Sequence, residues 1–285
     1  MAVRDDDRLR SLLREWWHLV PTTIATHVGG LLSRAWDVAA GDHRYVVRLV
    51  ESDRLPLEAG LAAADHARGR GVEAGRPLRT LRGELTVETP AGVFAVLRRV
   101  PGRPLVADDP VDQQFWGDRL GAVHTVLQGF QHPGLRPWRM LDADADHLVV
   151  EPWLRGAIAD TVTATTRLTV TDRLTYGVLH GDPAAGDFVV DPATGRAGVL
   201  DWGARGIGPL VYDVAAAVFY AGGPDSSGDL LGGYLAASPV DRDELDAALP
   251  VLLRFRWAVQ ADRWARGNDR AGLARARAAL ESLAR

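Results

Sequence analysis

Residues 179–213 of the 285-residue chain read LHGDPAAGDFVVDPATGRAGVLDWGARGIGPLVYD. Four aspartates hold defined places in this stretch. Asp182 comes directly after a His-Gly pair, and Asp187 follows five residues later. Asp201 ends an apolar run, and Asp213 opens an apolar helical pattern. Carboxylates at loop ends after hydrophobic strands suit Mg²⁺, because this ion takes oxygen ligands and shares them with phosphates.

The same stretch predicts a hairpin with its turn at residues 192–195. Pairing of its two strands would bring Asp187 and Asp201 to the same end of the hairpin. On the residues alone a second interpretation stands beside the metal site. These four aspartates can also serve as turn and helix-cap residues.

Hydrophobic periodicity around this stretch predicts a small β-rich N-terminal lobe at 1–101 and a larger helical lobe at 102–285, joined by a Pro-Gly-Arg-Pro linker. Predicted helices cover 5–19, 57–70, 113–128, 212–220, 229–237 and 243–285. Predicted strands cover 22–28, 33–38, 45–50, 85–88, 93–100, 177–179, 188–190 and 198–200.

The composition is that of a soluble globular enzyme, with 47% hydrophobic and 25% charged residues. A net charge of −4 and a pI near 6.1 argue against nucleic-acid and membrane-surface binding. The apolar runs are too short to span a bilayer, and the N-terminus is too polar for a secretory signal. We therefore expect a cytoplasmic protein.

Two residue types are missing from the sequence. Without cysteine there are no disulfides, no thiolate catalysis and no cysteine-bound zinc. Without lysine, all 33 basic residues are arginines, which excludes a Schiff-base lysine and a Walker-type P-loop. Asparagine is also rare, since Asn268 is the only one in the chain. Lysine and asparagine both use codons that start with AA, so a GC-rich source genome explains why both are scarce.

The quoted stretch resembles the catalytic core of the aminoglycoside phosphotransferase and choline kinase superfamily. That core reads His-Gly-Asp, a short hairpin, Asp-Trp or Asp-Phe, and a later glycine and aspartate. The matching residues are His180-Gly181-Asp182, Leu200-Asp201-Trp202, Gly208 and Tyr212-Asp213-Val214-Ala215. The resemblance implies an α+β, bilobal, protein-kinase-like fold with a small antiparallel β-rich N-lobe and a larger, mostly helical C-lobe.

The resemblance also implies site roles. Asp182 is expected to be the catalytic base, Asp201 and Asp187 to bind Mg²⁺, and Asp213 to be structural. His124, on a predicted helix of the larger lobe, is expected to be buried and structural. Asp187 stands where the family has asparagine, so it keeps an oxygen ligand and adds a negative charge.

In the N-lobe the resemblance implies a nucleotide site. Gly29, Gly30 and Ser33 would cover the phosphates, although a Gly-Gly pair is also an ordinary hairpin turn. Arg48 stands at the position of the lysine that clamps the phosphates, and Glu58 at that of its helix partner. Arginine keeps the charge but is bulkier and not equivalent to an ammonium group. Either the site tolerates these substitutions or selection for phosphoryl transfer has relaxed.

The implied activity is transfer of the γ-phosphoryl group of ATP, with GTP as an alternative donor, to a hydroxyl of a small polar acceptor such as an aminoglycoside, choline or homoserine. Trp257 and Gln260 on the last long helix are candidate acceptor-binding residues, although such tryptophans can also be core. Two other functions stay open: a Ser/Thr peptide kinase of a natural-product biosynthetic cluster, and a non-catalytic pseudokinase that scaffolds a protein partner.

Overall fold

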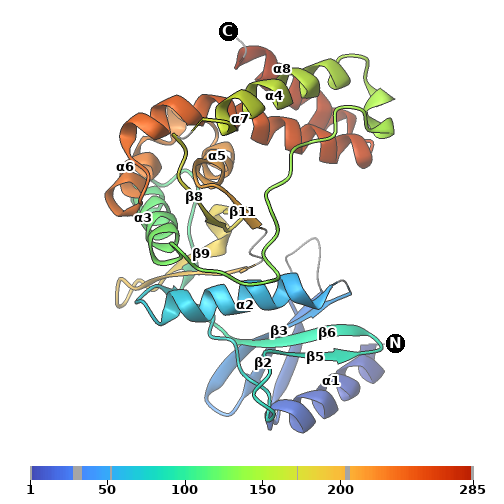
Figure 1. Cartoon of the computed structure of the whole chain (residues 1–285). Coiled ribbons are helices and arrows are strands. Elements are labelled where there is room, and N and C mark those ends of the chain that lie inside the picture. The colour runs from blue at the N-terminus through green and yellow to red at the C-terminus, as the bar shows by residue number, and fades with distance from the viewer. Residues whose placement is uncertain (1, 28–33, 52, 172, 203–205, 284–285) are drawn as a thin grey trace. The chain divides into compact units, whose positions relative to one another are not determined.

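A computed structural model describes the chain in five segments and divides it into two compact units (Figure 1). The described residues are 2–27, 34–51, 53–171, 173–202 and 206–283. Unit 1 comprises residues 1–103, 130–136 and 189–204, and unit 2 comprises residues 104–129, 137–188 and 205–285.

Unit 1 is built on a five-stranded antiparallel sheet in the order β1-β2-β3-β6-β5. Its strands are β1 (Thr23–Thr26), β2 (Arg34–Ala40), β3 (His43–Val50), β5 (Thr86–Thr89) and β6 (Gly92–Arg98). The turn between β2 and β3 contains Gly41 at φ 56°, a left-handed conformation that glycine adopts without strain. All five strands were predicted from the sequence, with bounds that differ by at most two residues.

The two faces of this sheet are covered by different helices. Helix α1 (Ala2–Trp17) covers one face of the sheet. Its residues Leu9, Leu13 and Trp17 form a hydrophobic core with Tyr45, Val47 and Leu49 of β3. Helix α2 (Arg54–Arg68) packs Leu57 and Leu61 against Val93, Ala95 and Leu97 of β6. The Asp53 side chain caps α2 at its start, and Gly69 ends it. The other residues of β3 that alternate with the core therefore lie on the face opposite α1.

A short sheet joins segments far apart in the sequence, in the order β4-β10-β9-β7. Its strands are β4 (Glu73–Ala74), β7 (Arg103–Pro104), β9 (Phe188–Val190) and β10 (Ala197–Val199). The turn between β9 and β10 is closed by backbone hydrogen bonds from Gly195 to Asp191 and from Asp191 to Arg196, 2.8 Å each. The hairpin predicted at residues 192–195 is confirmed.

Unit 2 is mostly helical. Its helices are α3 (Pro110–Val126), η1 (Asp146–Val150), α4 (Leu154–Thr169), η2 (Ala185–Asp187), α5 (Val211–Tyr220), η3 (Pro224–Ser226), α6 (Gly228–Ala237), α7 (Arg242–Arg266) and α8 (Arg270–Ser282). Strands β8 (Tyr176–Leu179) and β11 (Gly206–Pro209) form an antiparallel pair. None of the helices in the described residues is both long enough and apolar enough to cross a membrane.

Helices α3 and α6 approach each other through glycines. A Cβ atom on Gly117 would lie 1.9 Å from the carbonyl oxygen of Leu230, and one on Gly233 would lie 2.3 Å from that of Gln114. Both distances are far below any real contact. The two backbones therefore touch directly, without a side chain between them at these positions.

The predicted helix over 243–285 is wrong in one respect, because the structure divides it into α7 and α8. Gly267 caps α7, Asn268 adopts φ 51°, and the Asp269 side chain caps the start of α8. These are ordinary helix stop and start residues, so the break has a local cause. The C-terminal helices pack with α4 and η1 around Ile158, Ala261 and their neighbours.

Candidate active site

The His-Gly-Asp loop follows strand β8 and is held by one buried carboxylate. Asp213, fully buried in the first turn of α5, accepts hydrogen bonds from the backbone N–H of His180 at 2.6 Å and of Gly181 at 2.9 Å. Gly181 has φ 92°, which glycine adopts readily. The backbone just before Asp182 is therefore fixed by a charged acceptor, as expected of a structural aspartate.

His124 of α3 supports the same carboxylate. Its Nε2 lies 3.1 Å from Asp213 Oδ2, and its Nδ1 lies 2.9 Å from the hydroxyl oxygen of Tyr234 on α6. The His124 side chain is buried, as is that of Tyr234. The prediction that His124 is buried and structural is confirmed. Burial, with the charge of Asp213, raises the pKa of Tyr234 above its ordinary value, so this hydroxyl stays protonated.

Asp182 lies in a compact polar group. Its Oδ1 accepts hydrogen bonds from the hydroxyl of Tyr220 and from Nη2 of Arg256, each at 2.7 Å. The Asp182 side chain keeps 25% of its surface exposed, so the carboxylate is open to solvent on one side. Burial, and after it the nearby carboxylates, raise the pKa of Tyr220 to about 12 against the opposing charge of Arg256. Tyr220 is therefore a hydrogen-bond donor near neutral pH.

Asp187 lies in η2, five residues after Asp182. Its backbone N–H donates to the carbonyl of Ala184 at 2.9 Å, and its Oδ2 accepts from the N–H of Ala184 at 3.2 Å. This reciprocal pair fixes the carboxylate close to its own backbone. The side chain is half-buried. Asp187 is therefore an oriented oxygen donor of the kind that Mg²⁺ takes.

Asp201 and Arg48 form an ion pair within unit 1. Nη1 of Arg48 lies 2.5 Å from Oδ1 of Asp201. Asp201 has φ 49°, an uncommon conformation for a residue other than glycine, and the buried Trp202 donates from Nε1 to the carbonyl of Val199 at 3.1 Å. The turn after β10 thus presents a carboxylate that already holds a cationic group.

The structure corrects the predicted partner of Glu58. Glu58 accepts hydrogen bonds from Nε of Arg54 and from the hydroxyl of Thr86, each at 2.8 Å, instead of pairing with Arg48. Arg54 lies one helical turn before Glu58 on α2, a spacing that favours such pairs. The predicted Arg48–Glu58 pair is therefore wrong, because a local partner takes Glu58 and Asp201 takes Arg48.

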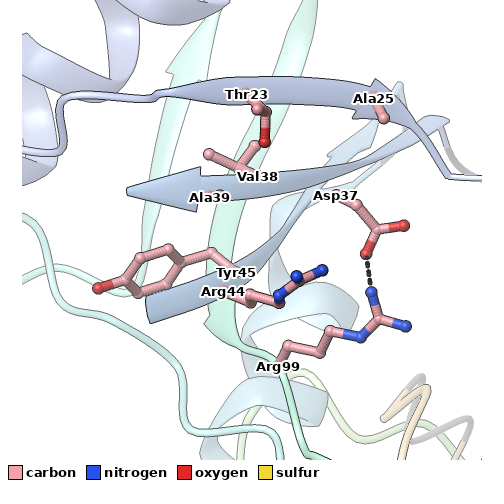
Figure 2. Close-up of a pocket in the computed structure, with 8 residues that line it drawn as sticks. All are labelled: Thr23, Ala25, Asp37, Val38, Ala39, Arg44, Tyr45 and Arg99. Atoms are coloured by element: carbon pink, nitrogen blue, oxygen red, sulfur yellow. Dashed lines mark hydrogen bonds and ion pairs between the residues drawn. The ribbon is translucent and has the colours of Figure 1, made fainter. Parts of the chain in front are cut away.

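Arg48 lies on the sheet face opposite α1, and a cavity of about 120 Å³ opens on that same face (Figure 2). The β2–β3 register pairs Asp37 with Val46, two residues from Arg48 on the same side of β3. Asp37 accepts a hydrogen bond from Nη1 of Arg99 at 3.0 Å and lies 2.9 Å from Nδ1 of His27. The cavity wall is thus polar. Gly29, Gly30 and Ser33 lie outside the described residues.

The two candidate acceptor-binding residues lie on α7. Trp257 packs against the hydrophobic cluster of α4, α7 and α8, with its ring 4.6 Å from that of Phe219 between centroids. Gln260 is half-buried. The packing of Trp257 agrees with the interpretation of this tryptophan as core, and acceptor binding by either residue stays a prediction.

Two residues of the Asp182 group were not predicted. Arg256 is 4% exposed and Tyr220 is partly buried, and both contact Asp182. A signal for Arg256 was present in the sequence, because it follows Leu252 and Leu253 at helical spacing and so falls on their apolar face. A lone arginine on such a face needs a partner. Tyr220 closes an apolar helix and carried no comparable signal.

The five-stranded sheet thus carries a basic residue on the face opposite α1, and the helical unit presents a carboxylate in the loop after a short strand. The model of the family described as "Phosphotransferase enzyme family" matches residues 23–248. The chain belongs to this family, and the resemblance predicted from its sequence is confirmed.

Solved structures agree on the fold. The amicoumacin kinase hAmiN, in complex with AMP-PNP, Ca²⁺ and Ami, is 16% identical with a TM-score of 0.79, over 98% of this chain and 93% of that one. A microcompartment-associated aminopropanol kinase is 17% identical with a TM-score of 0.70, over 98% and 94%. Spectinomycin phosphotransferase APH(9)-Ia, with ADP and spectinomycin, is 16% identical with a TM-score of 0.63, over 97% and 92%. A search among curated proteins found no match.

Proposed function

We propose that this phosphotransferase moves the γ-phosphoryl group of ATP to a hydroxyl of a small polar acceptor. The observation that carries the proposal is the His-Gly-Asp loop, which Asp213 holds by two backbone N–H groups so that Asp182 is presented at the end of β8. Phosphoryl transfer depends on positioning and charge neutralisation more than on covalent catalysis, and a fixed carboxylate meets the first need.

In the proposed reaction Asp182 accepts the proton of the acceptor hydroxyl. The acceptor oxygen bonds to the γ-phosphorus as the bond from that phosphorus to the bridging oxygen breaks, and ADP leaves. Arg48 would bind phosphate oxygens by its guanidinium group, which forms two parallel hydrogen bonds more readily than an ammonium does. Residues 1–101 would thus bind the nucleotide, and residues 102–285 the acceptor.

The acidic residues fit a magnesium ion. Mg²⁺ is commonly held by one or two carboxylates together with substrate phosphates, and Asp201 and Asp187 are the residues that would hold it. Asp201 already accepts the cationic group of Arg48, and within the described residues no cluster of three or more acidic, histidine or cysteine side chains offers a site made of protein alone. When bound, Mg²⁺ would neutralise the phosphates during transfer.

The test is an acceptor panel measured by ADP release. ATP and GTP are each supplied with Mg²⁺, and the acceptors are amicoumacin, spectinomycin, kanamycin, aminopropanol, choline and homoserine. We expect at least one acceptor to raise ADP release above the rate with water alone. A Ser/Thr-rich peptide acceptor tests the peptide-kinase alternative. No ADP release with any acceptor and no rise in melting temperature with ATP and Mg²⁺ would favour the pseudokinase scaffold instead.

Arg48→Ala should weaken ATP binding about tenfold, which corresponds to about 1.4 kcal/mol. This change removes the positive charge that would contact the phosphates. Lysine keeps a positive charge, so Arg48→Lys should retain most of the affinity. Calorimetric titration with ATP and Mg²⁺ measures both. Arg98→Ala is the matched control, because Arg98 pairs with Tyr45 and so lies on the other face of the sheet. Unchanged affinity in Arg48→Ala would exclude the phosphate contact.

Asp201→Asn should have opposite effects on the two forms of the nucleotide. With Mg²⁺ present, ATP should bind about tenfold more weakly, because a charged metal ligand is lost. Without Mg²⁺, ATP should bind as tightly as to the wild type or more tightly, because the charge of Asp201 no longer competes with phosphate for Arg48. Calorimetry with and without EDTA distinguishes the two effects, with Asp42→Asn in the exposed turn between β2 and β3 as control. Equal losses in both conditions would argue against a metal ligand.

A further inference from the structure

A buried cation stands beside the proposed catalytic carboxylate. Arg256 projects from α7, is 4% exposed, and has neighbours such as Leu252, Leu253 and Phe255 that are buried core residues. Its guanidinium carbon lies 5.1 Å from the ring centroid of Phe219 and 5.3 Å from that of Tyr220. Burying a guanidinium group is costly unless an anion compensates it. Asp182 supplies that anion at 2.7 Å.

The contacts to Asp182 are one-sided. Tyr220 and Arg256 both donate to Oδ1, and Nη2 of Arg256 also donates to the hydroxyl oxygen of Tyr220 at 3.0 Å. Three groups from the His-Gly-Asp loop, α5 and α7 thus form a closed triangle of hydrogen bonds. A carboxylate held through one oxygen by two donors cannot rotate without losing both bonds. Its other oxygen, Oδ2, is therefore held in a defined direction.

We propose that Arg256 and Tyr220 are positioning residues that fix the Asp182 carboxylate so that Oδ2 receives the proton of the acceptor hydroxyl. This inference rests on the proposed function, because it assigns a task to Asp182 as the base. In this proposal neither residue contacts the reacting atoms. Both act through Asp182, by keeping one carboxylate orientation populated before the acceptor binds.

The proposal predicts where the kinetic effect will fall. A displaced base slows the transfer step, and a misplacement of about 1 Å can cost about 10²-fold in rate. Nucleotide binding uses other residues, so the KM for ATP should stay within about twofold of the wild type, a small change on this scale. Loss of a single neutral hydrogen bond has a smaller effect than loss of the buried cation, so the Tyr220 variant should lose less than the Arg256 variant.

The experiment compares kcat and KM for the wild type, Arg256→Gln, Arg256→Lys and Tyr220→Phe. The acceptor is the most active one of the panel or, where none is active, water, measured as ADP release from ATP and Mg²⁺. We expect kcat to fall about 10²-fold in Arg256→Gln and about threefold to tenfold in Tyr220→Phe. Arg256→Lys should recover part of the loss, since it restores a buried cation. Arg263→Gln and Tyr176→Phe are exposed controls with the same chemical changes.

Chemical rescue separates positioning from folding. Arg256→Ala leaves space where the guanidinium group was. Guanidinium chloride at low concentration should raise its kcat about tenfold over an equal concentration of sodium chloride, which would restore about a tenth of the wild-type kcat after a 10²-fold loss. Melting temperatures are recorded for every variant. Wild-type kcat in Arg256→Gln, or an Arg256→Ala defect that guanidinium does not relieve, would overturn the proposal. A wild type inactive with all acceptors and water would overturn the proposed function, and this inference with it.

Discussion

Asp182→Asn should reduce turnover by about 10²–10⁴, the usual range for loss of a general base. Asparagine keeps an oxygen that can accept the hydrogen bonds of Tyr220 and Arg256, so the local structure should persist. It removes the group that takes the proton. The KM for ATP should hardly change, because the proposed nucleotide contacts come from other residues.

The measurement for Asp182→Asn is steady-state ADP release with the best acceptor of the panel, together with calorimetric ATP binding. Asp243→Asn, an exposed aspartate at the start of α7, makes the same chemical change away from the site. Turnover in Asp182→Asn equal to that of this control would show that Asp182 is not the base. A parallel loss of ATP binding would indicate a folding defect.

Asp213→Asn should lower the free energy of unfolding by about 3–5 kcal/mol, the range for losing one member of a buried charged network. The carboxylate accepts from two backbone N–H groups and faces His124, all buried, and an amide nitrogen in its place would oppose one of these donors. At about 2–4 °C per kcal/mol, the melting temperature should fall by roughly 6–20 °C.

Denaturant titration and thermal unfolding both measure this effect. Asp229→Asn is the matched control, because Asp229 also lies in the first turn of a helix but is exposed. We expect the control to change the melting temperature by less than about 2 °C, as surface substitutions usually do. A similar small change in Asp213→Asn would contradict the view that this carboxylate holds the His-Gly-Asp loop.

The sequence predicted those parts of the fold whose pattern is local. The strands of the five-stranded sheet, the hairpin between β9 and β10, and helices α3, α5 and α6 all follow hydrophobic periodicity bounded by turn residues. Helix α4 was not predicted as an element. It contains five threonines, which are weak helix formers, and four of them return their hydroxyls to the carbonyl four residues earlier. Packing against α7 and η1 stabilises it, and such contacts leave no local signature.

The residues of the candidate site that belong to the sequence motif were predicted. Site residues outside the motif were not. Asp182 and Asp213 are motif residues, whereas Arg256 lies 74 residues after Asp182. The Arg48–Glu58 pair failed for a related reason, because Arg54 competes for Glu58 from the same helix. The spacing of a motif predicts which positions of the chain correspond to those of the family. The partner of a charged side chain depends instead on which opposite charge lies nearest in space.

The direct contact of α3 with α6 has a consequence for how this protein can evolve. Since Gly117 and Gly233 leave no room for a methyl group, every larger residue there would force the helices apart. His124 on α3 and Tyr234 on α6 would move with them, and with them the support of Asp213. Substitutions at these two glycines are therefore not expected to be tolerated. Substitutions that the fold tolerates are therefore expected at positions whose side chains are exposed, such as those of η1 and α4.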